Sequence, residues 1–212
     1  MNTSAPKLSK PAMPKPKLLI IAGPNGSGKT SVTGKLLSHE WRSGCEYINA
    51  DDIARDVFGD WNSPEAVLEA ARLTTTQRKD CLANGRSLIF ETVFSSPEKI
   101  AFIAEAKRLD YFIRLFFIGT DDPSINAQRI VRRVMEGGHG VPIPKIISRY
   151  SKSITNCAIV APFVDRLYVL DNSVDNADAQ LLFRAVDGVL AKQYVPVNPW
   201  AEIIYQSVTP AA

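Results

Sequence analysis

Short apolar runs alternate with longer amphipathic segments along the 212-residue chain. The first run, residues 17–23, reads KLLIIAG and is apolar after its lysine, as expected for a strand that is buried on both faces of a sheet. The same pattern predicts further strands over residues 46–49, 87–90, 111–118 and 167–170. Strands that alternate with helices are typical of a parallel sheet with helices on both faces. We therefore predict a single α/β domain.

Helix signals fall between these runs. Residues 63–65 and 96–98 both read Ser-Pro-Glu, which places a cap, a proline and an acid at the start of a helix. Asp122-Pro123 marks another start, and Gly137-Gly138 ends the helix that follows it. The predicted helices cover residues 30–39, 63–82, 122–135 and 145–157, with one more that begins at residue 96. A last amphipathic helix is predicted from the apolar positions Ala179, Leu182, Phe183, Val186 and Leu190.

The first residues of the chain differ in composition from the rest. Residues 1–17 contain four lysines, four prolines and no acid, so they carry about +4 of formal charge while the whole chain carries +3. The prolines are spaced so that they block a helix, and the segment lacks the apolar stretch of a secretory signal. We expect residues 1–16 to form a flexible tail, residues 17–192 the domain, and residues 193–212 an irregular extension.

Charge and composition also exclude several classes of protein. The chain after the tail is near neutral, which disfavours nucleic acid as a partner because binding it requires a basic face. The longest apolar run, residues 18–22, is much shorter than the roughly 18 residues of a membrane span. Cys45, Cys81 and Cys157 match neither a disulfide framework nor a zinc spacing. We therefore expect a cytoplasmic protein without membrane contact.

The candidate chemistry begins directly after the first predicted strand. Residues 23–30, GPNGSGKT, match the phosphate-loop pattern G-x-x-x-x-G-K-[ST] between a buried strand and a helix. Glycines let backbone amides converge on phosphates, and the helix N-terminus adds positive partial charge. Lys29 is expected to reach the β- and γ-phosphates, and the Thr30 hydroxyl to ligate Mg²⁺. The residues predicted to bind a nucleoside triphosphate are Gly23, Pro24, Asn25, Gly26, Ser27, Gly28, Lys29, Thr30 and Ser31.

Acidic residues at the ends of later strands are candidates for the chemistry that follows binding. Asp51 and Asp52 come directly after the second predicted strand, where a carboxylate can accept a proton from a substrate hydroxyl, as the base of a kinase does. Either one can instead cap the next helix, and the two roles are compatible. Glu91 ends the third strand and precedes Thr92; it is interpreted as holding Mg²⁺ through water, orienting the substrate, or simply ending the strand. Asp171 is either a magnesium-site acid or a turn acid.

Arginines surround a loop that is rich in glycine and proline. Arg129 and Arg133 lie four residues apart on one predicted helix face, with Arg132 beside them, and Arg149 lies on the helix beyond the loop. Such arginines can close over a triphosphate and stabilise the transferring charge, or they can form a solvated basic face. His139, inside the loop, is interpreted as a loop contact rather than a general base.

Four stretches of the sequence together resemble one known family. They are GPNGSGKTS, INADDIA, LIFETVFSS and RRVMEGGHGVPIPKIISRYSKS, in this order between about residues 18 and 172. The last is the most specific, and on these residues the chain resembles the zeta-toxin-like kinases. The resemblance implies a phosphate-loop kinase fold with a five-stranded parallel sheet of order 2-3-1-4-5, helices on both faces and a helical lid. It also implies that the γ-phosphate of ATP is transferred to a sugar hydroxyl of UDP-N-acetylglucosamine.

The resemblance implies a role for each matching residue. Asp51 is the expected base on the acceptor hydroxyl, Glu91 and Thr92 lie on the substrate side, and Arg133 and Arg149 lie near the transferring phosphate. Arg129, Arg132 and Arg133 remain alternatives for the lid arginine, because the loop differs in length from that of the well-known toxins. Toxin members usually have an antitoxin, so an antitoxin is a possible protein partner.

Other functions remain compatible with the same residues. A kinase for another metabolite or an antibiotic, like the related chloramphenicol phosphotransferase, would need a similar loop and acid. A GTP-dependent switch would need the guanine-reading pattern N-K-x-D, which the sequence lacks. A protein that binds nucleotide without chemistry is disfavoured, because Lys29, Thr30, Asp51 and Glu91 are all present.

Overall fold

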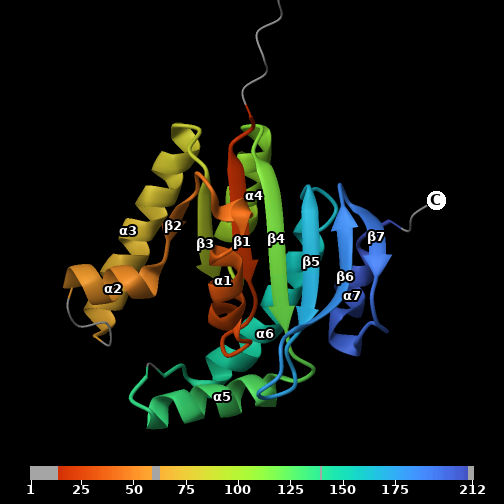
Figure 1. Ribbon diagram of the computed structural model, residues 1–212. Coiled ribbons are helices and arrows are strands. Elements are labelled where there is room, and N and C mark those ends of the chain that lie inside the picture. The colour runs from red at the N-terminus through yellow and green to blue at the C-terminus, as the bar shows by residue number, and fades with distance from the viewer. Residues whose placement is uncertain (1–13, 59–62, 139, 210–212) are drawn as a thin grey trace, which may run out of the picture.

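The computed structural model describes residues 14–58, 63–138 and 140–209 (Figure 1). Residues 1–13, most of the expected tail, therefore lie outside the described part. The described residues form a seven-stranded sheet with the order β2-β3-β1-β4-β5-β6-β7. Strands β1 to β5 run parallel to one another in the order β2-β3-β1-β4-β5, which confirms the predicted order 2-3-1-4-5. They are β1 (Lys17–Ala22), β2 (Glu46–Ile48), β3 (Leu88–Thr92), β4 (Phe112–Gly119) and β5 (Arg166–Asp171).

Helices cover both faces of the sheet (Figure 1). Helix α1 lies on one face, and α4, α6 and α7 lie on the other. Helices α2 and α3 flank β2, and α5 crosses below the carboxyl ends of the strands. Two of the predicted helix starts are capped as expected. Ser63 accepts a hydrogen bond from the Ala66 N–H at 3.1 Å, and Asp122 accepts one from the Ser124 N–H at 2.7 Å. The helical segments are α1 (Lys29–Leu37), η1 (Glu40–Arg42), α2 (Ala50–Phe58), α3 (Pro64–Ala83), α4 (Pro97–Arg108), α5 (Pro123–Met135), α6 (Ile143–Val160), η2 (Pro199–Ala201) and α7 (Glu202–Gln206).

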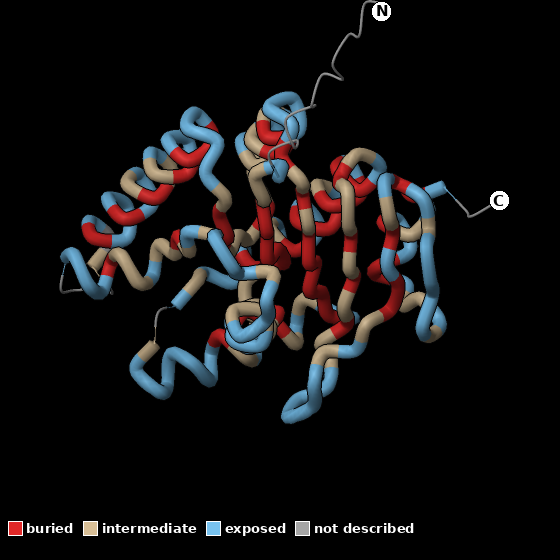
Figure 2. Tube along the Cα trace, turned by 45° about the horizontal axis from the view of Figure 1, so that its top comes forward, coloured by how far each residue is buried: buried red, intermediate tan, exposed pale blue. Residues whose placement is uncertain are grey.

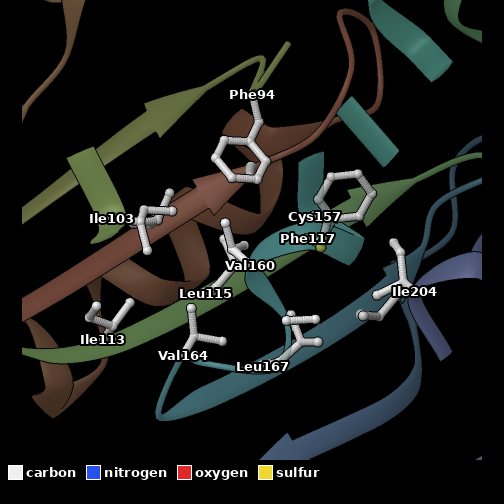
Figure 3. Packing of buried hydrophobic residues seen from close by; sticks show 14 of the residues in the cluster. Phe94, Ile103, Ile113, Leu115, Phe117, Cys157, Val160, Val164, Leu167 and Ile204 are labelled. Atoms are coloured by element: carbon white, nitrogen blue, oxygen red, sulfur yellow. The ribbon is translucent and has the colours of Figure 1, made fainter. Parts of the chain in front are cut away.

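Two hydrophobic clusters lie on opposite faces of the sheet. The larger joins the strands to α4, α6 and α7, and Figure 3 shows Leu115 and Phe117 of β4 together with Val160 of α6 and Ile204 of α7. The smaller lies beneath α1 and η1. Figure 2 shows that burial follows the central strands, whereas the outer helix surfaces are exposed. In the part of the chain that the structure describes, no helix is both long and apolar enough to cross a membrane.

The helix predicted over residues 179–190 is wrong, because this segment forms an antiparallel hairpin. Strand β6 (Gln180–Val186) pairs with β5 and with β7 (Val189–Gln193). The turn between them is Asp187-Gly188, with φ angles of 51° and 77°. An Asp-Gly pair with both residues in the left-handed region is the typical turn of a two-residue hairpin. The predicted sheet of five strands therefore gains two.

The segment after Gln193 is not wholly irregular, which corrects a second expectation. It contains η2 and α7, and Trp200, Ala201, Ile204 and Val208 join the larger hydrophobic cluster. Trp200 packs over Gly119 at the end of β4, where a Cβ atom would lie 2.3 Å from the indole ring. The indole N–H donates to a carboxylate oxygen of Asp171 at 2.9 Å. Trp200 thus fixes the end of the chain against the carboxyl ends of β4 and β5.

Trp200→Phe is expected to lower the free energy of unfolding by about 2 kcal/mol, because a buried hydrogen bond to a carboxylate is lost. Chemical denaturation of both proteins measures this difference. Tyr205→Phe is the matched control in the same segment: its hydroxyl donates to Gln193 at an exposed position, so we expect a loss below about 0.5 kcal/mol. Equal losses in the two variants would contradict a special role for the Trp200–Asp171 bond.

Candidate active site

The phosphate loop, residues 23–30, connects β1 to α1 at the carboxyl edge of the sheet. Parallel α/β sheets bind ligands at this edge. Gly23 and Gly28 have φ angles of 153° and 86°. A Cβ atom would lie 2.1 Å from the Ile118 carbonyl oxygen at Gly23 and 2.2 Å from the Asn172 amide nitrogen at Gly28. The backbone here therefore approaches its neighbours more closely than any side chain would allow.

Lys29 lies beneath the loop in the first turn of α1. Its ammonium group donates to the carbonyl oxygens of Gly23 and Pro24, both at 2.9 Å. Burial lowers the pKa of Lys29 to about 8; Glu91 and Asp51 oppose this effect, and Arg133 adds to it. Lys29 is therefore charged at neutral pH although its surroundings disfavour the charge.

The loop opens into a cavity of about 460 Å³ that holds most of the predicted site residues. Lys29 and Thr30 lie on its phosphate-loop side. Three more of the predicted site residues line it from the segments after β2 and at the end of β3, and helix α5 contributes two arginines. These residues are Asp51, Glu91, Thr92, Arg129 and Arg133. Parts of the chain up to about a hundred residues apart thus meet in one concave site.

The two candidate acids after β2 occupy different environments. Asp51 is exposed and lines the cavity. The Asp52 carboxylate instead accepts a hydrogen bond from Arg55 at 3.0 Å. The side-chain oxygen of Asn49 accepts from the Asp51 N–H at 2.8 Å, so the asparagine supports the first turn of α2. The sequence reading considered only the two aspartates for this capping role and missed Asn49.

Glu91 is held by a short hydrogen-bond chain that the sequence reading also missed. The Tyr47 hydroxyl donates to Glu91 Oε1 at 3.0 Å, and the Asn49 side chain donates to the Tyr47 oxygen at 2.7 Å. Burial and the neighbouring Glu91 hold the pKa of Tyr47 well above its usual value, so Tyr47 remains a neutral donor. Tyr47 lies in β2 and Asn49 directly follows it, so the two residues are two positions apart. This spacing is the one feature of the sequence that indicates that their side chains lie on the same side of the strand.

The four candidate arginines divide into three arrangements. Arg129 donates to the Asp175 carboxylate at 2.8 Å and to the Asn172 carbonyl oxygen at 2.7 Å, and Arg132 reaches Asp175 at 3.2 Å. Arg133 lines the cavity together with Asp51 and Lys29. Arg149 lies on α6 and donates to the Asn25 side chain at 3.3 Å. Arg129, Arg132 and Arg133 are the three alternatives for the lid arginine. Arg129 and Arg133 line the cavity, and Arg132 does not. His139, the predicted loop contact, lies outside the described residues.

Asp171 has the environment of a turn acid. Its carboxylate accepts from the Ser173 N–H at 3.1 Å, from the Ser173 hydroxyl at 2.7 Å and from the Trp200 indole. It is buried and lines neither of the cavities next to the phosphate loop. The structure therefore favours the turn interpretation over the magnesium-site interpretation.

A second cavity, of about 530 Å³, adjoins the loop on the other side. Gly28 and Arg129 line both cavities, so the two are neighbours. Apolar walls come from Val32, Leu36, Phe116 and Leu170. The rest of the lining includes Ser31, Lys35, Asn172 and the segment 174–179. A site of this size with apolar walls and a few polar groups is typical of pockets that bind small organic molecules.

The phosphate loop lies at the edge of a mostly parallel sheet, and strand-end acids and a helix with arginines face the loop. These features define a nucleotide-binding protein with the phosphate-loop kinase fold. The chain belongs to the zeta toxin family, whose model matches residues 3–180. Most of the hairpin, together with α7, therefore lies beyond the matched part.

Solved structures share this fold at low sequence identity. A chain of the AvrRxo1-ORF1:AvrRxo1-ORF2 complex superposes with a TM-score of 0.64 at 16% identity, over 92% of this chain and 64% of that one, and the complex has also been solved with ATP. The PezAT toxin–antitoxin system of Streptococcus pneumoniae gives 0.61 at 13% identity, over 95% and 82% of the two chains. A putative kinase from Chloroflexus aurantiacus gives 0.56 at 17%, over 78% and 93%. No curated protein sequence matches the chain.

Proposed function

We propose that the protein is a kinase that transfers the γ-phosphate of ATP to a hydroxyl of a small molecule, with UDP-N-acetylglucosamine or a related nucleotide sugar as the acceptor. One observation carries the proposal: Lys29 and Thr30 of the phosphate loop line the same cavity as the Asp51 carboxylate. A kinase needs a triphosphate site and a base within one enclosed volume. Membership of the zeta toxin family supports the nucleotide sugar as acceptor.

The predicted site residues divide the tasks of this reaction among them. Lys29 and the loop amides hold the triphosphate, while Arg133, and Arg149 beside Asn25, offset the negative charge that moves during transfer. Asp51 accepts the proton of the acceptor hydroxyl. The hydroxyl oxygen of the acceptor bonds to the γ-phosphorus, while the bond between the γ-phosphorus and the oxygen that bridges it to the β-phosphate breaks. Glu91, oriented by Tyr47, and Thr92 bind other hydroxyls of the acceptor. The adenosine part of ATP lies in the second cavity, between Phe116 and the segment 174–179.

The residues of the cavity also fit Mg²⁺. Thr30, Asp51 and Glu91 offer oxygen atoms, the ligands that this ion prefers. Among the described residues no group of three or more His, Cys, Asp or Glu side chains is placed to hold a metal. Mg²⁺ in kinase sites is commonly bound by one or two carboxylates together with phosphates and water. Thr30 would bind it directly, and Asp51 or Glu91 through water. When bound, it neutralises charge on the triphosphate.

An antitoxin-type protein partner belongs to the same proposal. It is supported by the family and by the toxin–antitoxin system among the similar structures. Such a partner would act by covering the cavity that contains Lys29 and Asp51.

The test is ATP consumption by the purified protein with Mg²⁺, with and without UDP-N-acetylglucosamine, and mass spectrometry of the products. We expect the sugar to stimulate turnover and to gain one phosphate. If ATP binds but the sugar has no effect, the acceptor is wrong, and a screen of hydroxylated metabolites and antibiotics follows. If no acceptor stimulates turnover, the kinase proposal fails.

A further inference from the structure

We propose that Asn126 and Asn172 are positioning residues that fix two peptide planes of the phosphate loop, so that the N–H groups of Gly26 and Gly28 point into the triphosphate site. The proposal rests on the triphosphate-binding half of the proposed function and not on the identity of the acceptor. Neither asparagine belongs to the phosphate-loop motif, and they lie about a hundred and about 145 residues further along the chain.

Asn126 holds the first plane from helix α5. It is fully buried, and its side-chain nitrogen donates to the Asn25 carbonyl oxygen at 2.6 Å. Its side-chain oxygen accepts from the Thr120 hydroxyl, which determines which end of the amide faces the loop. The backbone of Asn126 packs against the next loop residue, since a Cβ atom on Gly26 would lie 2.6 Å from the Asn126 carbonyl oxygen.

Asn172 holds the second plane from the segment after β5. Its side-chain nitrogen donates to the Ser27 carbonyl oxygen at 2.8 Å, directly beside Gly28. Its own carbonyl oxygen accepts from Arg129 at 2.7 Å, and Arg129 is paired with Asp175. The second asparagine is therefore fixed through α5, the helix that also carries the first.

The geometry of the peptide bond turns these contacts into an orientation of the loop. In a trans peptide the C=O and the following N–H point in opposite directions. The carbonyls of Asn25 and Ser27 are bonded to Asn126 and Asn172, neither of which lines this cavity, whereas Gly26 and Gly28 both do. We infer from this that the N–H groups of the two glycines face the cavity. Their φ angles of 76° and 86° suit a concave set of amides that binds anions.

Without the asparagines, either plane can turn over at little cost, because each is followed by a glycine. A turned plane would present a carbonyl oxygen to the phosphates, and the interaction would change from attractive to repulsive. The asparagines therefore prepare the loop for a triphosphate before it binds. Asn126, Arg129 and Arg133 share one face of α5, so the helix that orients the loop also places the arginine of the cavity.

The test measures binding of tripolyphosphate, ATP and adenosine by calorimetry to Asn126→Asp and Asn172→Asp. An aspartate has nearly the same shape but offers an oxygen to the loop carbonyl in place of a donor. We expect each variant to bind tripolyphosphate and ATP at least about tenfold more weakly. Affinity for adenosine should be unchanged in Asn126→Asp, because Asn126 does not line the second cavity, whereas Asn172 does. Asn126→Ala, which removes the donor without adding charge, is expected to lose less, about fivefold.

Asn156→Asp is the matched control. Asn156 also donates to a buried backbone carbonyl, that of Phe94 at 2.9 Å, but Phe94 is not part of the phosphate loop. We expect this variant to lose thermal stability, because the Phe94 carbonyl loses its donor, and to bind tripolyphosphate like the wild type. If Asn126→Asp does not fold, Asn172→Asp, which is only partly buried, still tests the proposal.

The inference would be overturned by wild-type affinity for tripolyphosphate in folded Asn126→Asp and Asn172→Asp, or by an equal loss in Asn156→Asp. A wild-type protein that binds no tripolyphosphate would overturn it as well. Failure of the acceptor reaction is a separate result, because it leaves tripolyphosphate binding intact and bears only on the proposed transfer.

Discussion

Asp51→Asn is expected to lower the rate of phosphate transfer by about 10²–10⁴-fold while ATP affinity stays within about twofold of the wild type. Asparagine keeps the size of the side chain and its place in the cavity but cannot accept the proton of the acceptor hydroxyl. The loss should therefore appear in kcat rather than in binding. Single-turnover assays with a nucleotide sugar and equilibrium titration with ATP measure the two quantities separately.

Asp52→Asn is the matched control for this experiment. It removes the same charge one residue further along α2, but the Asp52 carboxylate pairs with Arg55 and does not line the cavity. We expect its transfer rate to stay within about threefold of the wild type. Normal turnover in Asp51→Asn, or an equal loss in Asp52→Asn, would show that Asp51 is not the base.

Lys29→Met is expected to lower transfer at least about 100-fold and yet to stabilise the free protein at pH 7. The loss follows because Lys29, whose ammonium group lies against the loop carbonyls, is the residue proposed to hold the triphosphate during transfer. The gain follows because the buried ammonium group costs free energy in the folded state, and only part of this is recovered by its two bonds to backbone carbonyls. We expect a net gain of about 1 kcal/mol in the free energy of unfolding.

The pH dependence of the free energy of unfolding tests separately whether the charge on Lys29 destabilises the folded protein. The pKa of Lys29 is lowered from 10.5 to about 8 by folding, so below pH 8 both states carry the proton and the folded state bears the full cost. Between about pH 8 and 10.5 the folded protein releases the proton first, and the wild type gains up to roughly 3 kcal/mol relative to the variant.

Denaturation of wild type and Lys29→Met at pH 7 and pH 10 measures this change. Lys35→Met, on the exposed side of the same helix, is the control and should show no such trend. A stability difference that does not vary with pH would contradict the cost assigned to the buried charge.

Local signals explain why much of the fold could be predicted. The buried run before Gly23, the Ser-Pro-Glu helix starts and the phosphate-loop motif each occupy a few neighbouring residues, and the structure places them as expected. The hairpin was missed because Leu182, Phe183 and Val186 fit a helical period as well as a bulged strand. The pair Asp187-Gly188 distinguishes a hairpin from a helix in this segment, because Asp-Gly is typical of a two-residue hairpin turn and forms one here.

The candidate site was less predictable where it depends on side-chain direction. The residue pattern alone does not separate Asp51 from Asp52, and only the family resemblance names Asp51 as the base. Their places on α2 show that Asp51 lines the cavity while Asp52 pairs with Arg55. Tyr47 and Asn126 carry no motif, because a phenol or an amide that bonds to a single distant group leaves no spacing pattern. Such contacts require the folded chain.

Trp200 also determines where the chain can be joined to a segment taken from a related protein. The family match ends at residue 180, but the indole from residue 200 bonds to Asp171, the neighbour of Asn172 beside the phosphate loop. A boundary drawn at residue 180 therefore cuts through a connected network rather than between two modules. Hybrids that take the nucleotide-binding part from a relative would need to keep residues 181–209 with the strand ends they support.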